Sequence, residues 1–255
     1  MSAASGALLA GLSCAAPAAR HDEAPPDPPA TTEWHQEPVL EKRVGKNVVL
    51  YNHADATLEG ATIVELLQTQ YDWLAGYSGF APRWVLVHVG SRYPHGFMIR
   101  NGPDPEMFLQ AAGIFDTSNN YAHEMMHCFM SELGGSIPHW FNESMSDMAW
   151  IDAEIELWKR RREEPWLATL DRIDHRSYEL LTLRRAYGRG YFREVCAALR
   201  RRREECASTF ASDVKLDRKN GLILEALSAA AGEDVSGRLR AMGFDPRTRE
   251  RQRGY

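Results

Sequence analysis

Apolar residues recur with two different periods along the first half of the chain. Three short apolar runs, at residues 46–51, 83–89 and 96–100, have the β-prone composition of strands. Between the first two runs, apolar side chains from Ile63 to Leu74 follow the spacing of an amphipathic helix, so we predict a helix over residues 60–74. This order predicts a small mixed sheet packed against helices.

Residues beyond Trp150 show helical spacing only. One apolar stripe is formed by Leu180, Leu183, Tyr187, Tyr191 and Val195. It is interrupted at residues 188–190, where two glycines flank an arginine. Two further helices are predicted over residues 222–231 and 235–242, each followed by a glycine. The C-terminal half is therefore expected to be mainly α-helical.

The first 33 residues lack this periodicity. Residues 1–20 form a small-residue apolar run that is too short for a permanent membrane span and fits an export signal, although no Lys or Arg precedes the run. The segment 9–14 (LAGLSC) resembles a bacterial lipoprotein signal that ends at an acylated cysteine, Cys14, and the Pro-rich residues 22–33 fit a spacer. We expect an extracytoplasmic protein, secreted or tethered to a membrane through Cys14; a cytoplasmic protein with a disordered leader is the alternative.

The composition is that of a folded globular protein, with 44% hydrophobic and 25% charged residues. The 30 Lys and Arg residues against 35 Asp and Glu residues give a formal charge of −5, so no nucleic-acid partner is expected from the charge balance. Arginines crowd into residues 160–203, and we interpret them as solvated helix faces paired with nearby glutamates. Binding of an acidic partner or RNA is the alternative interpretation.

The four cysteines are too few and too scattered for a disulfide scaffold, and no C-x-x-C pair is present, which excludes a zinc ribbon. The sequence leaves open whether Cys196 and Cys206 pair. Cys128 is expected to be a small buried residue.

Residues 120–129 (NYAHEMMHCF) contain the motif H-E-x-x-H. On an α-helix His123 and His127 lie one turn apart and about 40° apart around the axis, so both imidazoles can bind one metal ion. Glu124 lies about 100° from His123, beside the open side of such a metal, where its carboxylate can take a proton from water. The motif therefore predicts a Zn²⁺ site with Glu124 as general base.

Zinc that is used for hydrolysis takes three protein ligands and leaves a fourth position for water. The first helix should end near Gly134, and Pro138 suits the first turn of a second helix. Glu143 follows at a distance that a helix end, a tight turn and a returning helix can span. It is the expected third ligand, with His139 and Asp147 as alternatives. Asp147, one turn beyond Glu143, is placed to accept the outer N–H of a ligand histidine.

The motif H-E-x-x-H followed by N-E-x-x-S-D resembles the two-helix zinc site of the gluzincin metallopeptidases, the thermolysin-like group. The resemblance implies that His123, His127 and Glu143 are the metal ligands, that Glu124 is the general base, and that Asp147 supports a ligand histidine. It also implies a zinc-dependent hydrolysis of peptide bonds.

The chain departs from that family in two ways. The interval between the motifs is shorter than in thermolysin and closer to compact members of the clan, in which a Trp-x-x-Glu segment, here residues 140–143, carries the third ligand. Ser144 stands where many of those proteins have glycine, so the resemblance does not transfer a substrate preference. A metzincin site is disfavoured because that pattern needs a glycine and then a histidine soon after His127, whereas the sixth residue after His127 is Leu133.

Gluzincin-like sites usually add a Tyr or His that stabilises the oxyanion of the transition state. Tyr187 and Tyr191 are the first candidates for this role, and His175 and Tyr178 are the second. The alternative for each tyrosine is packing in the core along the apolar stripe.

The expected fold class is α+β, with a small mixed β-sheet packed on the H-E-x-x-H helix and a mainly α-helical C-terminal half. We divide the chain into a leader and tether (1–33), a zincin-like α/β catalytic half (34–150) and an α-helical half that completes the cleft (151–255). The leading function is a zinc metallopeptidase acting on a peptide or protein, which would bind as an added strand along residues 96–100. The alternatives are a catalytically weak metallopeptidase-like domain that binds a peptide, glycan or surface partner, and an Arg-rich binding module with a coincidental motif.

Overall fold

The structure is a computed structural model that describes residues 38–53, 59–91, 93, 96–100, 103–111, 121–158, 175–245 and 247. The predicted leader with Cys14, the Pro-rich tether and the arginines at 160–162 lie outside these residues.

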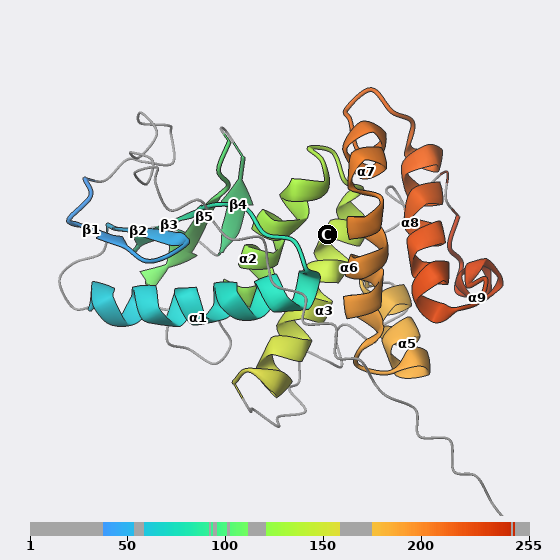
Figure 1. The fold of residues 1–255 in the computed structure, drawn as a ribbon, viewed down its shortest axis with the longest axis horizontal. Coiled ribbons are helices and arrows are strands. Elements are labelled where there is room, and N and C mark those ends of the chain that lie inside the picture. The colour runs from blue at the N-terminus through green and yellow to red at the C-terminus, as the bar shows by residue number, and fades with distance from the viewer. Residues whose placement is uncertain are drawn as a thin grey trace, which may run out of the picture.

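A five-stranded mixed sheet forms one side of the molecule (Figure 1). Its strands are β1 (Glu41–Val44), β2 (Val48–Asn52), β3 (Val85–Gly90), β4 (Phe97–Ile99) and β5 (Glu106–Gln110). The spatial order is β1-β2-β3-β5-β4, with β2, β3 and β5 parallel and the two edge strands antiparallel to their neighbours. The α+β fold class and the strands expected in the three apolar runs are confirmed, whereas β1 and β5 were not predicted.

Helix α1 (Gly60–Ser78) covers one face of the sheet (Figure 1). The register sets Leu50 beside Val87 and Val87 beside Met107, and these side chains share one buried core with Ile63 and Leu67 of the helix. The helix continues four residues past the predicted end at Leu74. It stops where Gly79 adopts φ 71 and its N–H donates to the carbonyl of Ala75, a left-handed end that favours glycine.

The remaining helices lie beyond the sheet. They are α2 (Tyr121–Met130), a 3-10 turn (Ser131–Leu133), α3 (His139–Glu156), α5 (Tyr178–Tyr187), α6 (Tyr191–Arg201), α7 (Arg203–Thr209), α8 (Leu216–Ala231) and α9 (Ser236–Ala241). The break at 188–190 and the helix ends at Gly232 and Gly243 are confirmed. Helix α8 begins six residues earlier than predicted, and Pro138 lies just before α3, where its carbonyl accepts the N–H of Phe141 and of Asn142. Among the described residues no helix has the length and apolar character needed to cross a bilayer.

The expected boundary at residue 150 lies inside α3. The larger of two buried apolar clusters runs from the sheet through α2 and α3 to α5, α6 and α8. The two halves are therefore parts of one folded unit.

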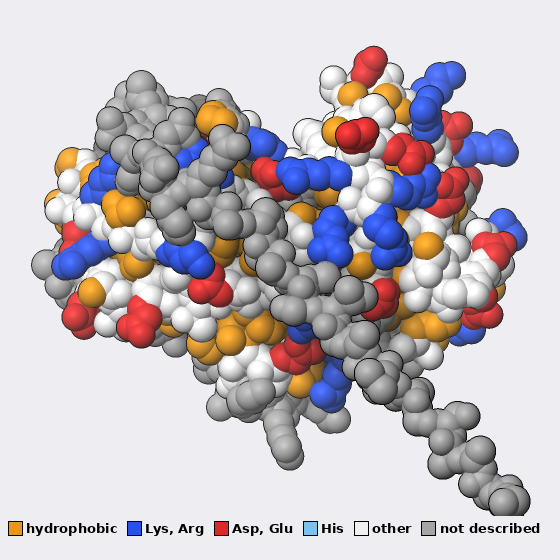
Figure 2. Space-filling model, viewed as in Figure 1, with side chains coloured by type: hydrophobic (Ala, Val, Ile, Leu, Met, Phe, Trp, Pro, Cys, Tyr) orange, Lys and Arg blue, Asp and Glu red, His pale blue; other side chains and the backbone are white. Residues whose placement is uncertain are grey.

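Arginines of the helical half pair with acidic groups, both with a nearby glutamate, as expected for Arg202 and Glu205, and with glutamates that are distant in the sequence. Arg202 lies 2.7 Å from Glu205 and 2.6 Å from Glu225, and Arg203 lies 2.8 Å from Glu132. Figure 2 shows Lys and Arg side chains interspersed with Asp and Glu over this half. Cys128, Cys196 and Cys206 are buried free thiols, so Cys196 and Cys206 are not paired in this structure.

A buried ionic cluster ties α1, α3 and α5 together. The Asp152 carboxylate accepts the Tyr77 hydroxyl at 2.9 Å and the Arg184 Nε at 3.1 Å, and Arg184 Nη2 also donates to it. The Asp152 side chain is fully buried. Because its carboxylate balances the charge of Arg184, removing it would leave a largely buried cation without a partner.

We therefore predict that Asp152→Asn lowers the free energy of unfolding by about 3 kcal/mol, measured by chemical denaturation. The matched control on the same helix is Glu156→Gln, because the Glu156–Arg193 pair is about one-third exposed, and it should cost about 0–1 kcal/mol. Equal effects of the two substitutions would contradict this account of the cluster.

Candidate metal centre

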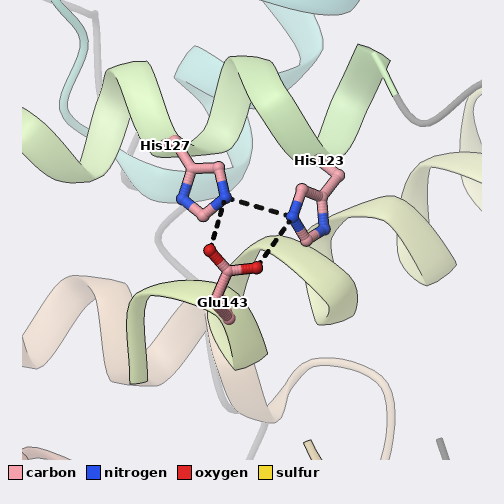
Figure 3. A group of neighbouring side chains, drawn as sticks. All are labelled: His123, His127 and Glu143. Atoms are coloured by element: carbon pink, nitrogen blue, oxygen red, sulfur yellow. Dashed lines mark hydrogen bonds and ion pairs between the residues drawn. The ribbon is translucent and has the colours of Figure 1, made fainter. Parts of the chain in front are cut away.

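Helix α2 brings the two motif histidines together. His123 and His127 are one turn apart and buried, and their Nε2 atoms lie 3.0 Å from each other. The ring planes are nearly perpendicular, at 83°, and the ring centroids are 4.7 Å apart. The two Nε2 atoms therefore point toward one common position beside the helix and do not lie on the line between the two rings (Figure 3).

Glu143 of α3 faces both nitrogens. Its Oε2 lies 3.3 Å from His123 Nε2 and its Oε1 lies 3.4 Å from His127 Nε2. The ligand atoms of the three residues lie within 4.8 Å of one another. Among the described residues this is the one group of three or more His, Cys, Asp or Glu side chains with such spacing. The donor set of two imidazoles and one carboxylate is one that zinc takes in hydrolytic enzymes.

The two alternative third ligands occupy other places. His139 lies one turn before Glu143, with a half-exposed side chain whose Nδ1 is 3.6 Å from Glu143 Oε1. Asp147 Oδ1 lies 2.9 Å from His123 Nδ1, on the side of that ring away from Glu143. Glu143 alone of the three faces both Nε2 atoms in the described contacts, as expected of the third ligand.

The outer nitrogens of both histidines have partners on α3. Besides the Asp147 carboxylate at His123, the Ser146 hydroxyl lies 3.1 Å from His127 Nδ1. Such partners fix the tautomer and the ring orientation of a ligand histidine. Asp147 was predicted for this position and Ser146 was not, although it lies on α3 directly before Asp147.

Two further residues at the site come from the turn before α5 and were not predicted. Arg176 Nη2 lies 2.9 Å from Glu143 Oε2, and its Nε lies 3.8 Å from Asp147 Oδ2. The Ser177 hydroxyl donates to the same Asp147 oxygen at 2.5 Å. Ser177 is 30 residues from Asp147 along the chain, so no short sequence motif links the two residues.

Glu124 lies where α2 meets the end of the sheet. Its side chain is buried, and Gly96 lies directly against it, because a Cβ on Gly96 would be 2.7 Å from Glu124 Cγ. Gly96 precedes the edge strand β4, so this edge borders the predicted general base. Burial raises the pKa of Glu124 to about 7, near the range in which a carboxylate can both accept and return a proton.

Burial and pairing set the proton distribution of the metal-free site. Burial lowers the pKa of His123, but the carboxylates of Asp147 and Glu143 outweigh it and raise that pKa to about 10. Burial, and then the charge on His123, lower the pKa of His127 to about 4. Burial raises the pKa of Glu143, but His123, His127 and Arg176 outweigh it and lower that pKa to about 2. At neutral pH His123 is therefore an imidazolium, with a proton on each ring nitrogen, and it lies between two carboxylates.

A second pair of buried histidines has a different geometry. His53 Nε2 and His88 Nδ1 are also 3.0 Å apart, but the ring centroids are 5.3 Å apart and the planes differ by only 26°. The N···N distance equals that of the His123–His127 pair, but the ring centroids are farther apart. Both nitrogens of the His53–His88 pair therefore lie on the line between the two rings, which is the geometry of an N–H···N hydrogen bond. The other nitrogen of His88 lies 3.4 Å from Glu106. This pair is therefore joined by a hydrogen bond between its two rings and lacks the convergence of the His123–His127 pair.

Tyr187 and Tyr191, the first candidates for the oxyanion role, have partners in the helical half. The Tyr187 hydroxyl donates to Glu233 Oε1 at 2.5 Å, and the Tyr191 hydroxyl donates to the carbonyl of Leu227 at 2.9 Å. The two rings stack at 5.0 Å, and Tyr191 is buried in the core. The structure thus places both tyrosines in the packing of α5, α6 and α8 and does not bring their hydroxyls to the His–His–Glu group.

Comparisons of the chain with protein-family models, with curated proteins and with solved structures found no match.

The metal-free protein should contain one histidine that keeps its second ring proton to unusually high pH. Because Asp147 and Glu143 stabilise the imidazolium, His123 is expected to titrate near pH 10, in histidine ¹⁵N–¹H correlation spectra of protein treated with a chelator. Its stabilising contribution is complete below the unfolded value of about 6.5 and is lost as the pH rises through about 10.

Asp147→Asn is the matched variant, because it removes one carboxylate and should lower the pKa of His123. If every histidine of the wild-type protein titrated below pH 8, the proposed pairing would be wrong.

Proposed function

We propose that the protein is a zinc-dependent metallopeptidase that hydrolyses peptide bonds. The observation that carries the proposal is the convergence of His123 Nε2, His127 Nε2 and the Glu143 carboxylate, with partners on the outer nitrogen of each ring. The position of Glu124, directly after the first histidine and against the sheet edge, gives further support.

The chain's own residues would divide the reaction between them. When bound, zinc would lower the pKa of a water molecule toward about 7 and polarise the scissile carbonyl. Glu124 takes the proton of the attacking water and delivers it to the leaving amine, so its carboxylate is regenerated at the end of each cycle. Asp147 and Ser146 keep the Nε2 atom of each histidine turned toward the metal.

The edge strand β4 would align the substrate. It pairs antiparallel with β5 on one side and is the last strand of the sheet on the other. An extended peptide could add to this edge by backbone hydrogen bonds, which would bring its scissile bond beside Glu124 because Gly96 touches that side chain. Backbone recognition of this kind fits a peptide or protein substrate better than a sugar chain.

Replacing the general base separates a peptidase from a silent binding domain. In Glu124→Gln the cleavage rate on a peptide library should fall by about 10²–10⁴, because the amide cannot accept a proton, while the protein still binds about one zinc ion per chain. Cleavage is followed by mass spectrometry, with and without chelator, and zinc by elemental analysis.

Glu65→Gln, on the exposed side of α1, is the charge-matched control and should cleave at the wild-type rate. Zinc bound without cleavage by wild type would favour the peptide- or surface-binding domain. A protein that takes up no zinc would favour the third alternative, an Arg-rich binding module.

Adding one methyl group at Gly96 should impair catalysis and leave the fold intact. The new Cβ would lie 2.7 Å from Glu124 Cγ and 3.2 Å from Glu124 Oε1, so the flexible Glu124 side chain must move. We expect Gly96→Ala to lower kcat about tenfold or more, with zinc content and melting temperature close to wild type.

Gly135→Ala is the control, because nothing lies within 4 Å of a Cβ at that position. A Gly96→Ala enzyme with wild-type kcat would show that Glu124 is not held by this contact during turnover.

A further inference from the structure

Ser144 connects the third ligand to a distant turn. It directly follows Glu143 on α3 and is fully buried. Its hydroxyl oxygen lies 2.6 Å from the carbonyl oxygen of Trp140 and 2.8 Å from the carbonyl oxygen of Arg176. The one hydroxyl proton is shared between these two acceptors, and the contact joins α3 to the backbone of the turn that carries Arg176.

That turn returns two side chains to the same helix. Arg176 donates toward Glu143 at 2.9 Å, and Ser177 donates to Asp147 at 2.5 Å. One short segment, anchored by Ser144, thus contacts the expected third ligand and also the carboxylate that supports His123.

The contact between Arg176 and Glu143 distinguishes the two carboxylate oxygens. Oε2 accepts from the guanidinium and also lies 3.3 Å from His123 Nε2, whereas Oε1 has its close contacts with His127 and His139. A charge-assisted hydrogen bond to Oε2 restricts rotation of the carboxylate, so that Oε2 stays beside His123 and Oε1 stays beside His127. The pair is only partly exposed, with 13% of the Glu143 side chain and 24% of the Arg176 side chain accessible, so solvent screens it less than a surface pair.

We propose that Arg176 is a positioning residue for the metal centre, and that Ser144 anchors it there. Arg176 holds Oε2 and so fixes the Glu143 carboxylate in the one orientation in which it faces both imidazoles. The inference rests on the proposed function, because it assumes that zinc binds to His123, His127 and Glu143. It concerns the support of a ligand and requires no contact between Arg176 and the substrate.

The first test measures zinc affinity by competition with a chelator, which needs no substrate. Arg176→Met should weaken zinc binding by about 10- to 100-fold, the usual effect of removing a group that orients a metal ligand. Ser144→Ala should weaken it in the same direction by less. Because both residues act through one contact, the double variant should be no weaker than Arg176→Met alone.

Three variants separate orientation from charge and from general damage. Arg176→Lys keeps the charge without the planar fork and should recover only part of the affinity. In Arg176→Ala, free guanidinium ion at millimolar concentration, far below denaturing levels, should restore part of the affinity. Arg189→Met removes an exposed arginine of the neighbouring loop and should bind zinc as wild type does.

The second test uses zinc-saturated protein and a cleaved library peptide. Arg176→Met should lower kcat with KM unchanged, because the ligand geometry is altered and the substrate site is not. A raised KM with unchanged kcat and zinc affinity would show that Arg176 binds substrate, and would overturn the proposal. Wild-type or tighter zinc binding in Arg176→Met would also overturn it.

The outcomes also distinguish this inference from the proposed function. If wild type binds zinc without cleaving peptides, the peptidase proposal fails while the affinity series still decides the role of Arg176. If wild type binds no zinc at this site, both proposals are wrong. Thermal unfolding of each zinc-free variant shows whether a loss of affinity reflects a loss of folded protein.

Discussion

Two imidazoles and two carboxylates are buried together where α2 packs against α3, and each group depends on the charge of its neighbours. His123 holds a proton in the interior because Glu143 and Asp147 lie on either side of its ring. His127, one turn along, is kept neutral by burial and by the charge on His123. An unpaired buried charge is strongly destabilising, so these groups must be brought together in one arrangement. The same arrangement leaves two imidazole nitrogens and a carboxylate facing one point, as a hydrolytic zinc site requires.

The helical half of the molecule fixes the position of α3 relative to α2. Ser136, in the loop between these helices, donates its N–H to the carbonyl of Phe210 at 2.8 Å and accepts from Lys219 Nζ at 2.8 Å. At the start of α3, Trp140 Nε1 donates to Asn220 Oδ1 at 2.9 Å. These contacts come from the end of α7 and from α8, so the C-terminal helices determine where α3 begins. The helical half is therefore part of the site's support even though the expected ligands all come from α2 and α3.

Sequence reasoning was most successful where a short-range rule applies. The helical period predicted that His123 and His127 share a face. The expected turn between two helices predicted that Glu143 of the second helix lies close to these histidines. The polar strand β1 (EKRV) and the short strand β5 (EMFLQ) carry too weak an alternation to be recognised. The contact of Arg176 with Glu143 depends on tertiary packing over many residues, which no local period encodes. The stripe containing Tyr187 and Tyr191 predicts helices. Its spacing is the same whether a tyrosine packs in the core or lies at an active site, so the sequence could not distinguish the two roles.

The most direct test of the account is the position of zinc in a crystal of the wild-type protein grown with one equivalent of zinc. An anomalous difference map collected at the zinc absorption edge identifies the metal independently of activity. We predict one strong peak between α2 and α3, with His123 Nε2, His127 Nε2 and one Glu143 oxygen at about 2.0–2.2 Å. The absence of a peak at these residues, or a single peak bound elsewhere, would contradict the central claim.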